Sequence, residues 1–270
     1  MKYSSQQNLY LTDQQCKQYD TEGFVIVRKL FSKNEILEIA RYANLLKEMA
    51  FKLANNIDDK VMHKGTQFVI SHKNKKPSID RIVWAGAIEP RLLEFGRISK
   101  ITHPVSQLLK AQYADHLINQ LHYKLPNDGV KFGWHIDLQN RMKFDTNWND
   151  VDRNGSFVQV ITAVDEHNIS NGPLRVIPGI DKNGPPKFPY MCDDLELSKI
   201  IDINQSIMLL LSPGDTVFLH PWIPHSSLPN KSAIERKTFL NGFSLPGANK
   251  KPYPGIGSAE KICLSKESTT

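Results

Sequence analysis

Two residues in the middle of the chain combine side-chain types that bind divalent metals. His135 and Asp137 stand at positions i and i+2 in Trp134-His135-Ile136-Asp137, and in a strand such positions point to the same face. An imidazole nitrogen and a carboxylate oxygen together suit a divalent transition metal such as iron(II). The pair alone is a weak signal, because H-x-D occurs by chance in many proteins.

A third ligand is available further along the chain, in the β-rich run over residues 215–227. That run contains His220 and His225, and either would complete a set of two histidines and one carboxylate. Such a set leaves positions on the metal open for oxygen and a chelating co-substrate, whereas a structural zinc site is closed by four protein ligands. The other histidines lack a partner at ligand spacing, and we expect surface or core positions for all of them: His63, His72, His103, His116, His122 and His167.

The elements that must position these ligands are predicted from the texture of the chain. From about residue 117, short β-rich runs alternate with Pro, Gly, Asn and Asp, which is typical of an antiparallel sandwich or barrel. These runs cover residues 117–125, 133–138, 157–164, 174–177, 206–211, 215–220 and 237–243. The preceding part is predicted to be mainly helical, because Thr12 with Gln15 and Ser32 with Glu35 have capping-box spacing. Helices followed by strands indicate a mainly β protein with flanking helices, namely a jelly roll.

We expect a single domain over residues 1–270, because no internal repeat, low-complexity tract or long linker interrupts the chain. Its expected parts are a helical support over about 1–116, a jelly-roll core over about 117–245 and a tail over 246–270. Within the support, a short strand is expected at residues 24–27 and a second helical region at 90–109.

Ordered motifs over most of the chain resemble the phytanoyl-CoA dioxygenase family, which also contains ectoine hydroxylase and natural-product oxygenases. The motifs are Gly133-Trp134-His135-Ile136-Asp137, then Asn171-Gly172-Pro173-Leu174-Arg175-Val176-Ile177-Pro178-Gly179, then Gly214-Asp215-Thr216-Val217-Phe218, His225-Ser226-Ser227, Asn230 and Arg236. The resemblance implies a double-stranded β-helix of the cupin-like type. It also implies a non-heme oxygenase that uses iron(II), O2 and the co-substrate 2-oxoglutarate.

The same resemblance implies roles for individual residues. The family's distal metal ligand precedes a small residue and a serine, a pattern that His225 matches and His220 does not. The family's arginine for the far carboxylate of 2-oxoglutarate falls at Arg236, and a guanidinium forms a bidentate pair that lysine cannot reproduce. Gln120 and Lys124 match residues that face the co-substrate, and Thr238 shares a strand face with Arg236.

The resemblance further implies release of succinate and CO2 while a substrate is oxidised. Halogenating relatives carry a small residue where Asp137 stands, so this carboxylate favours hydroxylation or another oxidation over halogenation. The polar segment 138–148 is expected to face the substrate. Within it Arg141 could pair with a substrate carboxylate, and Trp148 or Trp84 could wall the pocket. We expect a small polar metabolite, an amino acid or a natural-product intermediate as the substrate.

Composition excludes several classes of protein. Lys and Arg number 34 against 28 Asp and Glu, for a net charge of +6, but the excess is scattered. Its densest run, residues 72–76, is typical of a solvated loop, so no nucleic-acid partner is expected. A mild positive field instead suits an anionic small substrate. No apolar run approaches the roughly 20 residues that span a bilayer, and the absence of a signal peptide or cysteine framework favours the cytoplasm.

Two other classes of function remain open at this stage. A cupin-like metalloenzyme that does not use 2-oxoglutarate would leave Arg236 and Lys124 without a co-substrate to hold. A non-catalytic binding module on the same fold would be indicated by an incomplete set of metal ligands, and here the set is complete. The pattern of the chain does not indicate an oligomeric state.

Overall fold

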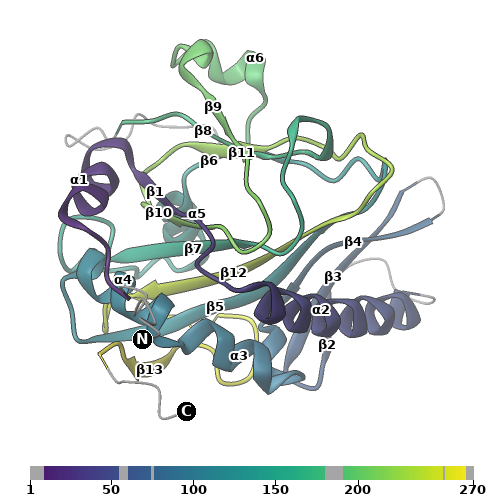
Figure 1. The fold of residues 1–270 in the computed structure, drawn as a ribbon, viewed down its shortest axis with the longest axis horizontal. Helices are drawn as coiled ribbons and strands as arrows, with labels where there is room; N and C mark the ends of the chain where they lie inside the picture. Colours follow the sequence, from purple (N-terminus) through teal and green to yellow (C-terminus); the bar gives the residue numbers. More distant parts are fainter. Residues whose placement is uncertain (1–8, 55–59, 74–75, 180–190, 252, 266–270) are drawn as a thin grey trace, which may run out of the picture.

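The computed structural model describes residues 9–54, 60–73, 76–179, 191–251 and 253–265. Within them, two antiparallel sheets lie face to face, and Figure 1 shows the smaller above the larger. The larger sheet has nine strands, ordered β1 (Phe24–Val27), β10 (Thr216–Leu219), β7 (Phe157–Ala163), β12 (Arg236–Ser244), β5 (Tyr113–Lys124), β4 (Lys76–Val83), β3 (Thr66–Lys73) and β2 (Lys60–His63), with β13 (Glu260–Cys263) beside β5. The smaller sheet is ordered β6 (Phe132–His135), β11 (His225–Ser227), β8 (Leu174–Val176) and β9 (Ile207–Leu209).

The chain passes between the two sheets in the order that defines a double-stranded β-helix. It leaves the large sheet at β5, enters the small one at β6, returns at β7, and crosses to β8 and β9. It then returns once more to β10, crosses to β11 and ends on β12, which pairs with β5 along its whole length. The predicted jelly roll is therefore confirmed.

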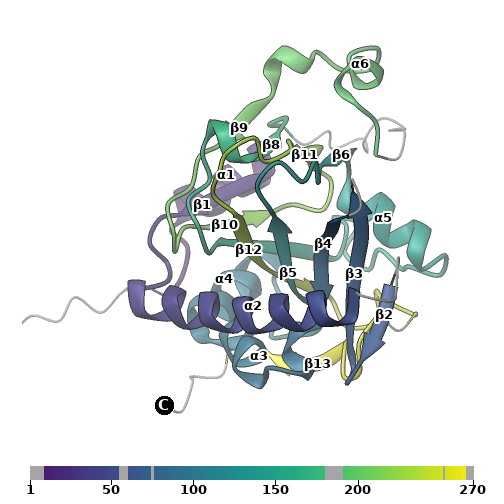
Figure 2. The ribbon, with the colours of Figure 1, turned by 90° about the vertical axis from the view of Figure 1, so that its right-hand side faces the viewer.

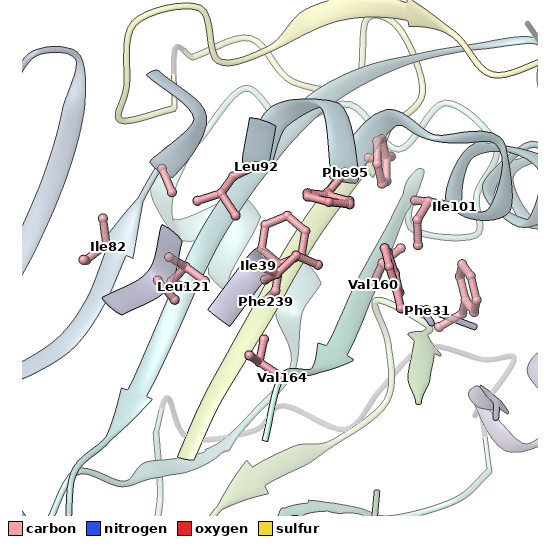
Figure 3. Close-up of a cluster of buried hydrophobic side chains, with 14 of the residues drawn as sticks. Phe31, Ile39, Ile82, Leu92, Phe95, Ile101, Leu121, Val160, Val164 and Phe239 are labelled. Carbon is pink, nitrogen blue, oxygen red and sulfur yellow. The ribbon is translucent and has the colours of Figure 1, made fainter. Parts of the chain in front are cut away.

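Helices cover the face of the large sheet that points away from the small one (Figure 2). The helices on this face are α2 (Lys33–Ala54), α3 (Pro90–Arg97) and α4 (Ser99–Leu109). The remaining helices lie elsewhere: α1 (Asp13–Glu22) packs beside β1, α5 (Asp137–Phe144) follows β6, and α6 (Asp194–Leu197) lies beyond the small sheet. The helical stripe of α2 buries Ile39 against the strands, and α3 adds Leu92. Figure 3 shows these side chains meeting Leu121 and Phe239 from β5 and β12. Since strand side chains alternate between faces, the neighbours of these core residues along β5 and β12 point toward the small sheet.

The expected helical support over 1–116 is wrong in its middle, where Lys60–His63, Thr66–Lys73 and Lys76–Val83 form β2, β3 and β4. Strand β3 is buried on one face only: Phe68 and Ile70 lie in the core, while Gln67 and Val69 lie on the other face. The pairing of β4 with β5 is a long-range contact that local propensity does not encode. The segment expected to be a tail, 246–270, contains strand β13, which pairs with β5 and so belongs to the large sheet. The strand at 24–27 is confirmed, and the helical region at 90–109 is divided into α3 and α4.

None of the described helices is long and apolar enough to cross a membrane.

A buried histidine in the large sheet makes the fold sensitive to acid. His116 is fully buried, stacks on Phe243 at 4.6 Å, accepts a hydrogen bond from Arg97 Nε and pairs with Asn241 Oδ1. Burial, reinforced by the charge of Arg97, lowers the pKa of His116 to about 3. Above the unfolded pKa of about 6.5 both states are neutral. As the pH falls below that value the unfolded chain takes up the proton first, so stability decreases.

We therefore expect His116 to contribute about 1.4 kcal/mol per pH unit to the loss of unfolding free energy between pH 6 and pH 4. Urea denaturation at several pH values measures that slope. The His116→Gln variant keeps a polar side chain but does not titrate, so its slope should be shallower by that amount, whatever its absolute stability. An unchanged slope would show that His116 is protonated in the folded protein.

Candidate metal centre

Three potential ligands come together where the small sheet meets α5. His135 is the last residue of β6, Asp137 is the first residue of α5, and His225 is the first residue of β11. Strands β6 and β11 are neighbours, and His135 pairs directly with His225 in their register. One donor atom from each of the three residues lies within 4.8 Å of the others, and Asp137 Oδ1 is 3.8 Å from both Nε2 atoms.

Backbone carbonyl groups orient both imidazole rings. His135 Nδ1 lies 2.7 Å from the Gly133 carbonyl oxygen and His225 Nδ1 lies 3.0 Å from that of Ile223. A carbonyl oxygen only accepts, so each Nδ1 carries the proton and each Nε2 keeps its lone pair for a metal. Burial, and then the neighbouring His225, lower the pKa of His135 to about 4. Two histidines and a carboxylate with this geometry fit an iron(II) site with open positions.

The local structure around Asp137 differs from the predicted strand over 133–138. The strand ends at His135, Ile136 keeps an extended backbone, and Asp137 begins helix α5. The reason is packing, because Leu138 is buried and its amide donates to the Pro221 carbonyl. The two ligands therefore converge from different elements. A carboxylate is also favoured at the N-terminus of a helix, where the amide groups are unpaired.

A close backbone approach holds β6 in position. A Cβ atom added to Gly133 would lie 2.4 Å from the Met191 carbonyl oxygen. The next residue, Trp134, exchanges backbone hydrogen bonds with Cys192, and its indole nitrogen donates to Asp194. Only glycine permits this approach, so Gly133 helps to place the adjoining His135.

The second histidine of the late run lies outside the cluster. His220 is buried, its ring is 5.2 Å from that of Tyr19, and its Nε2 pairs with Asn154 Oδ1 at 3.2 Å. Its Nδ1 accepts from the backbone amide of Trp222. Burial lowers the pKa of His220 to about 4. Both ring nitrogens of this neutral side chain are thus already engaged with the protein.

A cavity of about 430 Å³ opens beside the three ligands, between the two sheets. The large sheet supplies Gln120, Arg236 and Thr238 to its wall, and α5 supplies Arg141. The sequence-predicted ligands and these four polar residues therefore share one cavity. The position of Arg141 is set by aromatic rings, since its guanidinium lies 4.6 Å from the ring centre of Tyr253.

Arg236 is a buried cation with a vacant hydrogen-bonding edge. Its Nη1 contacts Thr238 Oγ1 at 3.2 Å and His167 Nε2 at 3.1 Å, while its buried Nε has no partner. Among the described residues no carboxylate forms an ion pair with it, and Asp165 acts only at longer range. Burial lowers the pKa of Arg236 to about 10, so the guanidinium is charged at neutral pH. A buried cation of this kind fits a carboxylate of a bound co-substrate.

Gln120 offers a second polar group to the cavity. Its Nε2 lies 2.9 Å from His122 Nε2, and its buried Oε1 has no hydrogen-bond partner in the described chain. The Gln120 amide nitrogen is therefore held by His122, and its oxygen is available to accept a hydrogen bond from a ligand.

The expectation that Lys124 faces the co-substrate is not supported. Its Nζ donates to the backbone carbonyls of Val130, Ser227 and Leu228, and the residue does not line the cavity. Lys124 is the last residue of β5, and its buried ammonium bridges the segment after β5 and the segment after β11. The four-residue spacing between Gln120 and Lys124 places both on the same face of β5. It does not show how far along the strand the cavity extends, and the cavity includes Gln120 but not Lys124.

Trp84 and Trp148 were expected to line the cavity, and neither of them does. Trp84 is almost fully buried, and its Nε1 donates to the Ile256 carbonyl at 2.7 Å. Trp148 packs against Phe157, with ring centres 6.4 Å apart. Trp84 thus holds the segment near Ile256, which follows the jelly roll, and Trp148 holds its own segment against the start of β7.

Several lining residues were missed because they come from segments without a motif. His122 and His167 line the cavity and are held neutral, since burial and then the charges of Arg81 and Arg236, respectively, lower their pKa values. The i, i+2 relation of His122 to Gln120 could have revealed the first of them. Further lining residues come from β2, β3 and β4 and from the C-terminal segment after β12: Lys60, Gln67, Arg81, Val83, Tyr253 and Pro254.

Comparisons with known proteins agree with this geometry. The family model for phytanoyl-CoA dioxygenase matches residues 19–238. Peroxisomal phytanoyl-CoA dioxygenase from Bos taurus is 26% identical over 255 residues, covering 89% of this chain and 70% of that protein. Dioxygenase lolE1 from Epichloe uncinata is 30% identical over 87 residues, so the chain matches only 33% of the length of that relative.

Solved structures share the fold at lower identity. EctD from S. alaskensis, with 2-oxoglutarate and 5-hydroxyectoine bound, superimposes with a TM-score of 0.71 and 19% identity over 93% of this chain and 82% of that chain. EvdO2 from Micromonospora carbonacea var. aurantiaca, in complex with 2-oxoglutarate, gives a TM-score of 0.65 and 19% identity over 90% and 95%.

Proposed function

The chain belongs to the phytanoyl-CoA dioxygenase family of iron(II)- and 2-oxoglutarate-dependent oxygenases, and we propose that it hydroxylates a small polar molecule with release of succinate and CO2. The observation that carries this proposal is the presence of a three-residue metal cluster and a buried arginine without a carboxylate partner in one cavity. A cupin-like metalloenzyme without 2-oxoglutarate would leave that arginine's charge uncompensated, which is costly.

His135, Asp137 and His225 would hold the iron, each through one atom. When bound, iron together with O2 and 2-oxoglutarate supplies the oxidising chemistry. The protein fixes the ligands before the metal arrives, because both Nδ1 atoms are already bonded to carbonyl oxygens. Asp137 occupies the carboxylate position that halogenating relatives leave small, and this supports hydroxylation.

Arg236 would bind the far carboxylate of 2-oxoglutarate, with Thr238 and Gln120 beside it. The guanidinium can present two parallel N–H groups to a carboxylate, and Thr238 can add a hydroxyl donor. The cavity wall here is made by β5 and β12, two fully paired strands. Such a rigid wall excludes water and keeps the co-substrate at one orientation relative to the metal ligands.

The substrate would enter from the side formed by α5 and the chain near Tyr253. Asn140 and Arg141 face the cavity from α5, and Phe144 adds an aromatic surface. This lining is mixed polar and aromatic, which supports a polar substrate of modest size rather than a long acyl chain.

Anaerobic titration with iron(II) and 2-oxoglutarate tests the proposal. Chelation of iron by the keto acid is expected to produce a weak visible charge-transfer band, which requires both additions. Glutarate has the same two carboxylates but no keto group, so it should give no band. If iron binds and 2-oxoglutarate produces no band, the protein is a metalloenzyme of another kind.

A further inference from the structure

We propose that Lys60 and Arg81 form a cationic arm that binds a carboxylate or phosphate group of the substrate, an inference that rests on the proposed oxygenase function. Both residues line the cavity from strands β2 and β4, outside the jelly-roll core. Neither is a metal ligand, and neither is needed for the co-substrate site described above.

The register of the large sheet places this arm in line with the co-substrate site. Lys60 pairs with Val69, Val69 with Arg81, Arg81 with His122, and His122 with Thr238. Directly paired residues in a sheet project to the same face. Figure 2 shows β5, β4, β3 and β2 following one another across the sheet. The row therefore leads from Thr238, beside the co-substrate, outward to Lys60 at the open edge.

The spacing of the strands separates the arm from the co-substrate anchor. Neighbouring strands lie about 4.8 Å apart, so the backbone of Arg81 is about 10 Å from that of Thr238. His122 stands between them in the row. Arg236 already accounts for one carboxylate of 2-oxoglutarate, and chelation of the metal accounts for the other. A second group with negative charge is needed to pair with Arg81.

The charges around the cavity point in the same direction. Among the described residues that line it, Asp137 is the one acidic side chain, and it belongs to the metal cluster. No acidic side chain of the described chain forms an ion pair with Lys60 or Arg81, and the buried Nε of Arg81 has no hydrogen-bond partner. With iron, Asp137, 2-oxoglutarate and Arg236 in place, their charges cancel. The arm and Arg141 on α5 then remain as excess positive charge.

The chemistry of the arm selects an oxyanion. A guanidinium offers paired N–H donors that match two oxygens of a carboxylate or phosphate, and a lysine adds a point charge. Gln67, on β3 between the two strands, lines the same face and can donate an amide hydrogen. A neutral substrate would leave the Arg81 guanidinium partly desolvated and unpaired, which costs free energy. The inferred substrate class is thus small acids or phosphate esters.

Matched probes test this inference without knowledge of the natural substrate. Isothermal titration calorimetry under anaerobic conditions would use protein saturated with iron(II) and 2-oxoglutarate. The probes are phenylacetate, its neutral analogue phenylacetamide, and phenyl phosphate. We expect at least one of the two anions to bind at least tenfold more tightly than phenylacetamide. Which of them binds more tightly distinguishes a carboxylate from a phosphate site.

The variants assign the effect to the arm. Arg81→Gln is expected to weaken anion binding about tenfold or more, corresponding to loss of a charged hydrogen bond, and Arg81→Lys should recover part of it. Lys60→Gln should have a smaller effect, because Lys60 is exposed. Lys33→Gln, an exposed lysine of α2 away from the cavity, is the control for net charge.

Three outcomes would overturn the inference. One is equal binding of phenylacetate, phenyl phosphate and phenylacetamide, and another is anion binding that survives in both Arg81 variants. The third is a raised 2-oxoglutarate requirement in Arg81→Gln, which would assign the guanidinium to the co-substrate. Failure of the oxygenase proposal would be seen separately, as a missing iron–2-oxoglutarate band recorded on the same protein before any probe is added.

Discussion

His225→Ala is expected to abolish iron(II) binding, whereas His220→Ala should retain most of it. His225 Nε2 lies 3.8 Å from Asp137 Oδ1 in the ligand cluster, while both nitrogens of His220 are engaged elsewhere. Loss of partners that only orient a metal ligand already costs about 10–100-fold in affinity, so removing a ligand should cost more. Metal content after anaerobic reconstitution and desalting measures the difference.

His220→Ala provides a demanding control, because it removes a buried ring that contacts Tyr19. We expect a loss of stability from the cavity, with iron still bound by the folded fraction. Circular dichroism at the temperature of reconstitution establishes that both variants are folded. Iron retained in His225→Ala and lost in folded His220→Ala would reverse the assignment of the third ligand.

Arg236→Ala is expected to raise the 2-oxoglutarate requirement by about thirtyfold or more, because losing one side of a buried charge pair costs roughly 2–5 kcal/mol. Iron binding should survive, since Arg236 is not one of the clustered ligands. Arg236→Lys should recover only part of the loss, because an ammonium cannot form two parallel hydrogen bonds. Titration of the charge-transfer band with 2-oxoglutarate gives the affinity of each variant.

Arg81→Gln is the matched control for this experiment, since it removes a second guanidinium from the same cavity. It should leave the 2-oxoglutarate affinity unchanged. Unchanged affinity in Arg236→Ala would place the carboxylate anchor elsewhere. Lys124 is a poor replacement, because backbone carbonyl groups already bind its ammonium.

Two of the three clustered residues were predictable from local spacing, whereas the third, far along the chain, was chosen between His220 and His225 only through the family resemblance. His135 and Asp137 are two residues apart, and the pattern around His225 distinguishes it from His220. The jelly roll was also predictable, since short strands separated by turn residues are a property of each segment. Helix α5, which begins at Asp137, was not predictable, because the burial of Leu138 against the rest of the protein determines that a helix begins there.

The errors concern residues whose positions depend on distant partners. Arg81 reaches the cavity only because β4 pairs with β5, and nothing within residues 60–83 identifies that neighbour. Lys124 and Trp84 have chemically suitable side chains, but carbonyl groups in the segments after β5, β11 and β12 bind their polar atoms. A polar side chain at the end of a strand can bind either a ligand in the cavity or a nearby backbone group, and tertiary packing decides which of the two it binds.

The large sheet is built from two parts of the chain, and each part lines a different side of the cavity. Strands β5 and β12 carry the groups beside the co-substrate, while β2, β3 and β4 form an appended hairpin array at the open edge. On the roles proposed above, replacements on β2, β3 and β4 would change which molecule is accepted and leave iron and 2-oxoglutarate binding unaltered. Exchange of residues 60–83 between relatives is therefore a direct route to enzymes with new selectivity.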